Sequence, residues 1–151
     1  MNYNGAKSAT FTFANKCTYT VWAGTLNNPN KPTLAQTRFQ LDTGASQTVE
    51  APAGWVGRMW GSTRCTTDIS GKFTCVTGDC GVHIPCNGAR PAPLATLVGF
   101  TLGTKGNKDF YDTNLVDGFN LPFSITPVGG IGDCRVSGCS TVVNAVYPPE
   151  L

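Results

Sequence analysis

Short segments in which hydrophobic and polar residues alternate are the main pattern along this chain. In residues 9–14, ATFTFA, phenylalanine alternates with threonine, which is typical of a β-strand with one buried face. Similar or fully apolar segments recur, separated by glycine, proline, asparagine and aspartate. The pattern predicts strands at residues 9–14, 19–23, 39–41, 47–51, 56–62, 94–102, 110–116 and 121–126.

Two of these segments indicate how the strands face a core. Residues 56–62 place Arg58 and Trp60 on one face and Met59 on the other. Residues 94–102, LATLVGFTL, form the most apolar run, and a run this short with an internal glycine fits a buried strand better than a helix. No segment has a convincing amphipathic helical pattern. We therefore predict an all-β fold, a sandwich or flattened barrel.

Length and composition agree with a single β domain. A chain of 151 residues is most simply one domain, and 18 glycines, 10 prolines and 13% charged residues favour short strands and many turns. A net charge of +2 is too small and too scattered to indicate a nucleic-acid partner. No run of 18 apolar residues is present, so we expect no membrane span.

Seven cysteines indicate an oxidising compartment, and four of them lie between residues 65 and 86. The economical pairing joins Cys65 to Cys75 and Cys80 to Cys86, and each bridge would contribute roughly 2.5–3 kcal/mol. The spacings C-x4-C and C-x5-C, with one histidine in the chain, argue against zinc. We expect disulfide-stapled loops, no metal and no cofactor. Because the number of cysteines is odd, at least one thiol has no partner within the chain.

The N-terminal segment has no apolar core of a secretory signal, although the cysteines indicate secretion. Residues 5–9, GAKSA, resemble the small-residue segment that precedes a cleavage site. We expect residues 1–8 to be a leader remnant or a disordered N-terminus, and residues 9–151 to form one β domain.

Several motifs together resemble one plant family. They are NKCTYTVW, GRMWGSTRC, CVTGDC, DFYDTNLVDGFNLP and the final VNAVYPPEL, and residues 9–151 as a whole resemble the thaumatin-like, pathogenesis-related proteins. The resemblance implies a thaumatin-like β-sandwich, secretion to the apoplast and antifungal plant defence. Members of this family bind β-1,3-glucan of fungal walls, some hydrolyse it weakly, some permeabilise fungal membranes, and many are allergens.

The chain departs from the family pattern in three respects. The family's last segment, which adds a strand and several cysteines, is absent after Leu151. By resemblance, Cys17, Cys134 and Cys139 would pair with cysteines of that segment, so here we expect them to be unpaired or alternatively paired. Tyr147 stands where the family has a cysteine before proline, and residues 80–83 lack the usual second glycine.

The family's functional feature is an acidic cleft formed by one arginine, one glutamate and three aspartates. The matching motifs assign Arg58 in GRMW, Asp112 in FYD and Asp117 in VDG to three of these positions. The glutamate position, thirteen residues before Asp112, holds Gly99, and the third aspartate falls in the absent segment.

Hydrolysis of a glycoside needs two carboxyl groups, about 5–5.5 Å apart for retention or 6.5–9.5 Å for inversion. Asp112 and Asp117 are the candidate catalytic residues, but a fully extended chain would separate them by roughly 16–18 Å and point them to opposite faces. They could converge only if residues 113–116 bend. Weak endo-β-1,3-glucanase activity is therefore the alternative to binding alone. A third interpretation is a truncated isoform without a ligand that keeps only an allergenic surface.

Saccharide binding requires less than hydrolysis, because aromatic rings stack on pyranose rings while charged groups bond their hydroxyls. Phe110, Tyr111 and Phe119 flank the two aspartates. We expect Tyr111 to present an exposed ring, with core packing as the alternative for Phe110 and Phe119. The predicted carbohydrate-binding residues are Arg58, Asp112, Asp117, Tyr111 and Phe110.

Each candidate also has a structural interpretation. Asp117 could bond the backbone of its own turn, and Arg58 could pack against Trp60. Asp79 is expected to accept hydrogen bonds within its loop, His83 to lie on a surface loop, and Glu50 to be a solvated strand residue. We expect a monomer that binds β-1,3-glucan or the fungal wall. Some short members of the family inhibit glycosidases, so a glycosidase is a further candidate partner.

Overall fold

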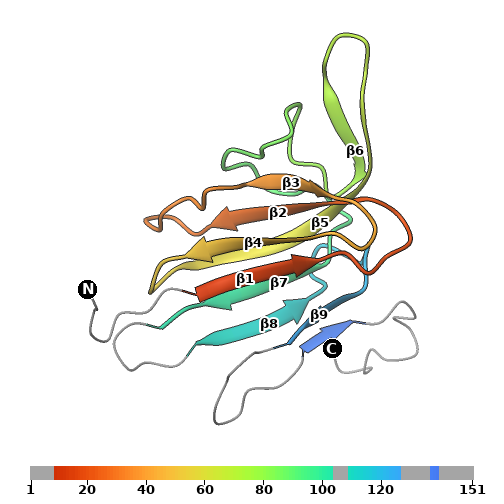
Figure 1. Ribbon diagram of the computed structural model, residues 1–151. Helices are drawn as coiled ribbons and strands as arrows, with labels where there is room; N and C mark the ends of the chain where they lie inside the picture. Colours follow the sequence, from red (N-terminus) through yellow and green to blue (C-terminus); the bar gives the residue numbers. More distant parts are fainter. Residues whose placement is uncertain (1–8, 104–108, 127–136, 140–151) are drawn as a thin grey trace.

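The structure is a computed structural model, and it describes residues 9–103, 109–126 and 137–139. These residues form ten β-strands and no helix (Figure 1). The strands are β1 (Ala9–Ala14), β2 (Val21–Asn27), β3 (Arg38–Leu41), β4 (Ser46–Ala51), β5 (Val56–Thr67), β6 (Phe73–Thr77), β7 (Leu97–Thr101), β8 (Phe110–Asn114), β9 (Phe123–Ile125) and β10 (Ser137–Cys139). No helix capable of crossing a membrane occurs in the part of the chain that the structure describes.

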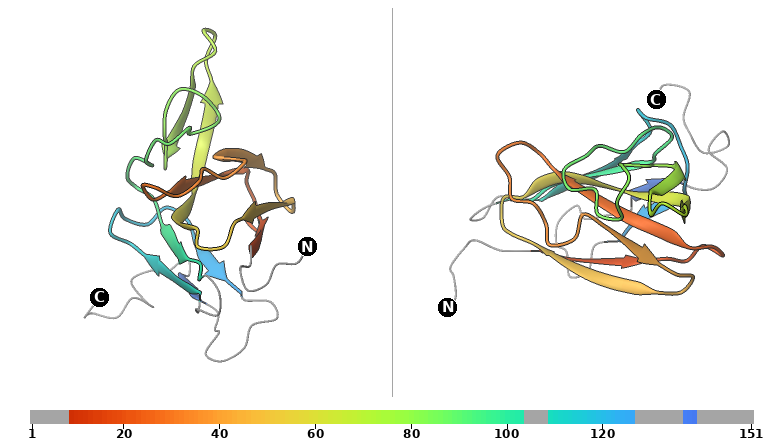
Figure 2. Two further views of the ribbon diagram at one scale, coloured as in Figure 1. Left: turned by 90° about the vertical axis from the view of Figure 1, so that its left-hand side faces the viewer. Right: turned by 90° about the horizontal axis from the view of Figure 1, so that it is seen from above.

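The strands form one large antiparallel sheet and two small ones. The large sheet has the order β3-β2-β5-β7-β8, and β6 also pairs with β5. Strands β1 and β4 pair with each other and lie over one face of the large sheet, as the views in Figures 1 and 2 show. Strands β9 and β10 form the third sheet. The predicted all-β, thaumatin-like sandwich is confirmed.

The first hydrophobic core lies between the large sheet and the β1–β4 pair. Alternation in β1 turns Phe11 and Phe13 toward this core. The Phe11 ring meets the edge of Trp55, with ring centroids 6.3 Å apart, and Phe13 meets Phe39 at 5.2 Å. Trp55 is completely buried. Because an aromatic side chain buries 150–250 Å², these rings supply much of the apolar area that holds the two layers together.

The second core lies on the opposite face of the large sheet, under residues 78–96. Trp60 is completely buried there, while its neighbour Met59 belongs to the first core, as the alternation in residues 56–62 predicts. Trp60 donates a hydrogen bond from Nε1 to the carbonyl of Gly78 at 3.1 Å. Its ring lies 2.5 Å from where a Cβ would be on Gly24, so any larger residue at position 24 would displace the tryptophan.

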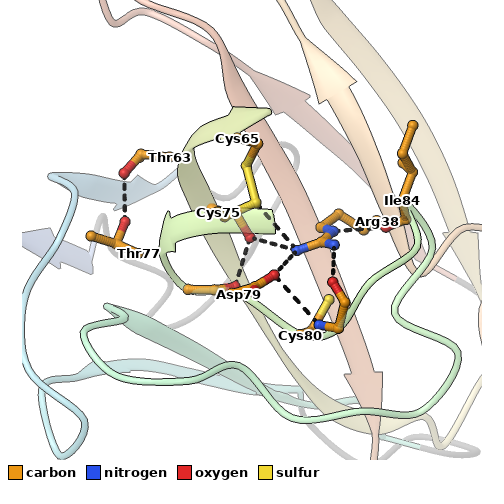
Figure 3. Close-up of a disulfide and its surroundings, with 12 residues drawn as sticks. Arg38, Thr63, Cys65, Cys75, Thr77, Asp79, Cys80 and Ile84 are labelled. Atoms are coloured by element: carbon orange, nitrogen blue, oxygen red, sulfur yellow. Dashed lines mark hydrogen bonds and ion pairs between the residues drawn. A yellow bond between two sulfur atoms is a disulfide. The ribbon is translucent and has the colours of Figure 1, made fainter. Parts of the chain in front are cut away.

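Covalent and polar contacts together hold the cystine-rich stretch (Figure 3). Disulfides join Cys65 to Cys75 and Cys80 to Cys86, which is the pairing favoured by the sequence. The first bridge links β5 to β6. Both sulfurs of the second bridge belong to residues buried in the second core.

Arg38 of β3 anchors the loop closed by Cys80 and Cys86. Its side chain is fully enclosed, and its guanidinium donates to the carbonyl oxygens of Ile84 at 2.7 Å and His83 at 2.8 Å. It also pairs with Asp79, with Nη1 3.4 Å from Oδ1, as Figure 3 shows. Burial lowers the pKa of Arg38, and the bond to Asp79 opposes that shift.

Strand β5 is longer than predicted, because its second half pairs with β6, a strand that the sequence did not indicate. This β5–β6 arm projects from the body of the molecule (Figure 1). At its tip, Asp68 Oδ1 accepts hydrogen bonds from the backbone of Ser70 and Lys72 and from the Ser70 hydroxyl. Ile69 at the tip is fully exposed.

Several other predicted strands are correct in existence and differ in extent or pairing. Strand β2 runs from Val21 to Asn27, so it extends beyond the predicted segment 19–23, and β7 is shorter than residues 94–102. Strands β3 and β4 flank a turn at residues 42–44, yet β3 pairs with β2 and β4 pairs with β1. The turn therefore carries the chain from one layer to the other.

Candidate functional site

The sheet register places Arg58, Gly99 and Asp112 side by side. Arg58 of β5 lies opposite Gly99 of β7, and Gly99 lies opposite Asp112 of β8. Directly opposite residues of an antiparallel pair share one face of the sheet. Arg58 and Asp112 are therefore on one face, two strand spacings or roughly 10 Å apart along the backbone. Trp60 lies two residues beyond Arg58, so this is the face that carries the second core.

The Asp112 carboxylate leans across β7. Its Oδ1 lies 2.7 Å from the position that a Cβ of Gly99 would occupy. Arg58 is half-buried and Asp112 is exposed, and among the described residues they form no ion pair, because none other than Arg38–Asp79 has a nitrogen–oxygen distance within 4.0 Å. A donor and an acceptor thus lie on the same face of the sheet, with the Asp112 carboxylate over the backbone of Gly99.

Phe110 adds an apolar surface beside these charged groups. It is two residues before Asp112 on β8, so both side chains are on the same face. It lies opposite Thr101 of β7, one row along from the Gly99–Asp112 pair. Its side chain is 64% exposed, which leaves its ring available to a ligand. We call Arg58, Gly99, Asp112 and Phe110 the β5–β8 face.

Tyr111 is on the other side of the sheet, and this corrects the expectation that it presents the exposed ring. Its half-buried ring is tilted against Phe100, with centroids 6.5 Å apart, and Phe100 in turn meets Phe11 of β1 at 4.6 Å. Alternation along β8 turns Tyr111 toward the layer formed by β1 and β4. A ligand on the β5–β8 face would meet Phe110 and would not reach Tyr111.

Asp117 lies beyond β8 in a turn whose Gly118 N–H donates to the carbonyl of Leu115 at 2.9 Å. The Asp117 carbonyl accepts a hydrogen bond from the backbone of Ala95 at 3.1 Å. Ala95 is four residues before Gly99, roughly 13 Å along an extended chain. Strand β8 thus ends at Asn114, before the predicted end at residue 116, and the turn that follows carries Asp117 toward the start of β7 and away from the row that holds Asp112.

This geometry suits hydrogen bonding better than acid–base chemistry. A glycosidase needs a second carboxyl group within about 10 Å of the first, so that the two flank the scissile bond. At the position directly between Arg58 and Asp112 there is Gly99, which has no side chain. Among the described residues, no group of three histidine, cysteine, aspartate or glutamate side chains gathers as a metal would require.

Asp79, His83 and Glu50 lie where their structural interpretations predict. Asp79 accepts from the backbone of Gly81 and pairs with Arg38, His83 is exposed on its loop, and Glu50 is exposed on β4 and accepts from the Thr10 hydroxyl at 2.7 Å. The role of Arg38 was not predicted, because an arginine in a strand gives no local signal of burial.

Cys17 has no disulfide partner within the described residues and is half-buried. Its backbone N–H donates to Asn15 Oδ1 at 2.8 Å. Burial, followed by a hydrogen bond with the Cys17 thiol, raises the pKa of Tyr19. Cys134 and the side chain of Cys139 lie outside the described residues, so the pairing expected for them stays a prediction.

The two-layer antiparallel fold with disulfide-stapled loops places the chain among the β-sandwich proteins. Comparison with known sequences identifies the family within this class. A model described as the Thaumatin family matches residues 15–151. The chain belongs to the thaumatin family.

Relatives from fruit trees are about half identical to this chain. Thaumatin-like protein 1 of Prunus persica is 54% identical over 150 residues, which cover 99% of this chain and 61% of the relative. A Prunus avium protein named glucan endo-1,3-beta-glucosidase is 49% identical over 152 residues, covering 100% of this chain and 62% of the relative. The chain thus spans about three fifths of the length of these curated relatives.

A solved structure has the same fold. The thaumatin-like xylanase inhibitor TLXI superimposes with a TM-score of 0.62 and 31% sequence identity. The match covers 75% of this chain and 72% of the inhibitor.

Proposed function

We propose that this protein is a secreted plant defence protein that binds β-1,3-glucan of fungal walls through the β5–β8 face. The observation that carries the proposal is the register of β5, β7 and β8, which aligns Arg58, Gly99 and Asp112 beside the exposed ring of Phe110. Family membership and the two disulfides support secretion and a defence role.

The chemistry of the face suits a neutral polysaccharide. The Arg58 guanidinium can donate to sugar hydroxyls and the Asp112 carboxylate can accept from them, and charged partners strengthen such hydrogen bonds. Phe110 offers an apolar ring for the apolar side of a pyranose. Gly99 lies between the two charged residues and has no side chain, so the Asp112 carboxylate can lie over the backbone of β7, on the side of Arg58.

Hydrolysis of the same glucan is the second candidate, and it is supported by the name of the Prunus avium relative. Gly99 and the displaced Asp117 argue for binding without turnover, since Asp112 has no second carboxyl group beside it on β7. A reducing-sugar assay on laminarin separates the two functions. We expect no turnover, and turnover that Asp112→Ala abolishes would replace the binding function with a glucanase.

Retention on insoluble β-1,3-glucan tests the binding function directly. We expect the wild-type protein to be retained at low salt, and Asp112→Asn and Arg58→Gln each to weaken retention at least about tenfold, because a charge-assisted hydrogen bond contributes about 1.5–3 kcal/mol. Glu50→Gln is the matched control, since Glu50 is an exposed carboxylate on β4, in the other layer.

Cellulose, the β-1,4-linked glucan, controls for non-specific adsorption. Failure of the wild-type protein to bind β-1,3-glucan at low salt would exclude the proposed function. Equal weakening by Glu50→Gln and Asp112→Asn would show that retention depends on net charge and not on the β5–β8 face.

A further inference from the structure

A cavity of about 680 Å³ lies at the base of the β5–β6 arm, away from the β5–β8 face. It is bounded by the start of β2, the arm, the segment before β7 and the segment after β8, and its volume is in the range of small-molecule sites. Neither Arg58 nor Asp112 lines it. The residues that matter for its chemistry are Tyr19, Trp22, Arg64, Val76, Leu94 and Phe119.

The walls of this cavity, which we call the arm cavity, are largely apolar. Tyr19, Val76 and Leu94 are 47%, 67% and 52% exposed, and all three converge on it. Trp22 and Phe119 are half-buried and line it as well. Single exposed apolar side chains are common on proteins, whereas a group of them around one hollow marks a site of interaction.

Most polar groups on the walls are already engaged within the protein. The hydroxyls of Thr63 and Thr77 bond to each other, and the Asn120 amide donates to the Gly61 carbonyl at 2.8 Å and to Thr77 at 2.9 Å. The Thr20 hydroxyl donates to Asp42 at 3.1 Å. These groups therefore fix the shape of the cavity and leave its interior with few hydrogen-bonding groups to offer.

Arg64 is the exception among the lining residues. It is exposed in β5, between the Thr63–Thr77 and Cys65–Cys75 pairs, and no carboxylate of the described residues lies within 4.0 Å of its guanidinium. It is close enough to the Tyr19 hydroxyl for its charge to lower the pKa of that group, against the effect of burial. The arm cavity thus combines aromatic and aliphatic walls with one cation at the rim, Arg64, that has no carboxylate partner among the described residues.

We propose that the arm cavity binds a small amphiphilic anion, an aromatic or aliphatic carboxylate with an apolar body. The apolar body would lie against Trp22, Leu94 and Phe119, and the carboxylate would meet the guanidinium of Arg64. Arginine suits this role because its planar fork matches a carboxylate with two parallel hydrogen bonds. This site is independent of glucan binding on the β5–β8 face.

Two fluorescent probes with the same ring system separate the two parts of the site. Anilinonaphthalene sulfonate carries an anionic group, and N-phenyl-1-naphthylamine is its uncharged analogue. We expect both to bind the full chain with a stoichiometry of one, and a medium-chain fatty acid such as decanoate to displace them. Arg64→Gln should weaken the sulfonate about tenfold and leave the neutral probe unchanged. Arg90→Gln, an exposed arginine outside the cavity, is the matched control.

Leu94→Thr tests the apolar wall and should weaken both probes several-fold, with near-UV circular dichroism confirming that the fold is kept. Equal affinity of the sulfonate for wild type and Arg64→Gln, or an equal loss in Arg90→Gln, would overturn the proposal. A second copy of the chain is the other candidate occupant of this surface. Sedimentation that shows a dimer which the probes dissociate would assign the arm cavity to self-association instead.

Discussion

The carboxylate of Asp112 occupies the space in which a side chain at position 99 would begin, with Oδ1 2.7 Å from the ideal Cβ position of Gly99. Real Cβ contacts are essentially never that short. The position of this carboxylate, and with it the distance to Arg58, therefore depends on a glycine in the neighbouring strand.

Gly99→Ala should consequently weaken glucan binding without destabilising the fold. The clash is with the end of a flexible side chain, so Asp112 can swing away, and alanine in a strand is roughly 0.5–1 kcal/mol more favourable than glycine. We expect several-fold weaker retention on β-1,3-glucan with an unchanged or higher urea midpoint. In the double variant with Asp112→Asn, Gly99→Ala should have little further effect, because both act through one carboxylate. Additive losses would contradict this coupling.

Arg38→Met should strongly destabilise the protein. The substitution removes the donors to the carbonyls of His83 and Ile84 and leaves Asp79 without its cation. Removing one partner of a buried pair typically costs about 3–5 kcal/mol. Urea unfolding measures the change, and Arg90→Met is the control because Arg90 is exposed. Equal midpoints for the two variants would show that Arg38 does not anchor the cystine loop.

The two disulfides should differ in their contribution to stability. Loop-closure entropy alone gives each roughly 2.5 kcal/mol. Cys80 and Cys86 are also 6% exposed within the second core, whereas Cys65 and Cys75 are half-buried at the base of the arm. We therefore expect the double serine variant at positions 80 and 86 to lose more unfolding free energy than the one at 65 and 75. The reverse order in urea titrations would contradict this argument.

The number of free thiols follows from the same pairing. Two bridges use four of the seven cysteines, which leaves three. Thiol titration in denaturant should find three reactive groups in a monomer, or one if Cys134 pairs with Cys139. Intact mass with and without reduction gives the disulfide number independently. Seven reactive thiols would mean that neither bridge forms in the isolated protein.

Asp68 should make the arm tip sensitive to acid. The Ser70 hydroxyl and then the Lys72 backbone N–H lower the pKa of Asp68, so its contribution to tip stability is present above the unfolded value of about 3.9 and is lost as the pH falls through the lower folded value. Ser70→Ala should raise the pKa of Asp68, as measured by carbon NMR titration of the carboxyl group. Thr66→Ala, on the same arm, should leave it unchanged.

The local pattern of hydrophobic and polar residues predicts much of the fold. The limits of β1 agree with the predicted segment, the alternation around Arg58 puts Met59 and Trp60 in different cores, and short spacing pairs Cys65 with Cys75. These features depend on neighbours within about ten residues, so the chain itself contains the information. The candidate site residues were assigned by resemblance to a family, which indicates their positions in the sequence but not the distances between their side chains.

Tertiary structure decided which of those residues meet. Alternation establishes that Phe110 and Tyr111 face opposite ways, but only the packing of β1 over Phe100 decides that Tyr111 is half-buried against Phe100 and Phe110 is exposed. Likewise, the register of three strands brings Arg58 beside Gly99 and Asp112, and the loop of residues 79–84 packs over Arg38. Such outcomes depend on contacts between segments far apart in the chain, because burial of a face is determined by what covers it and not by the segment that presents it.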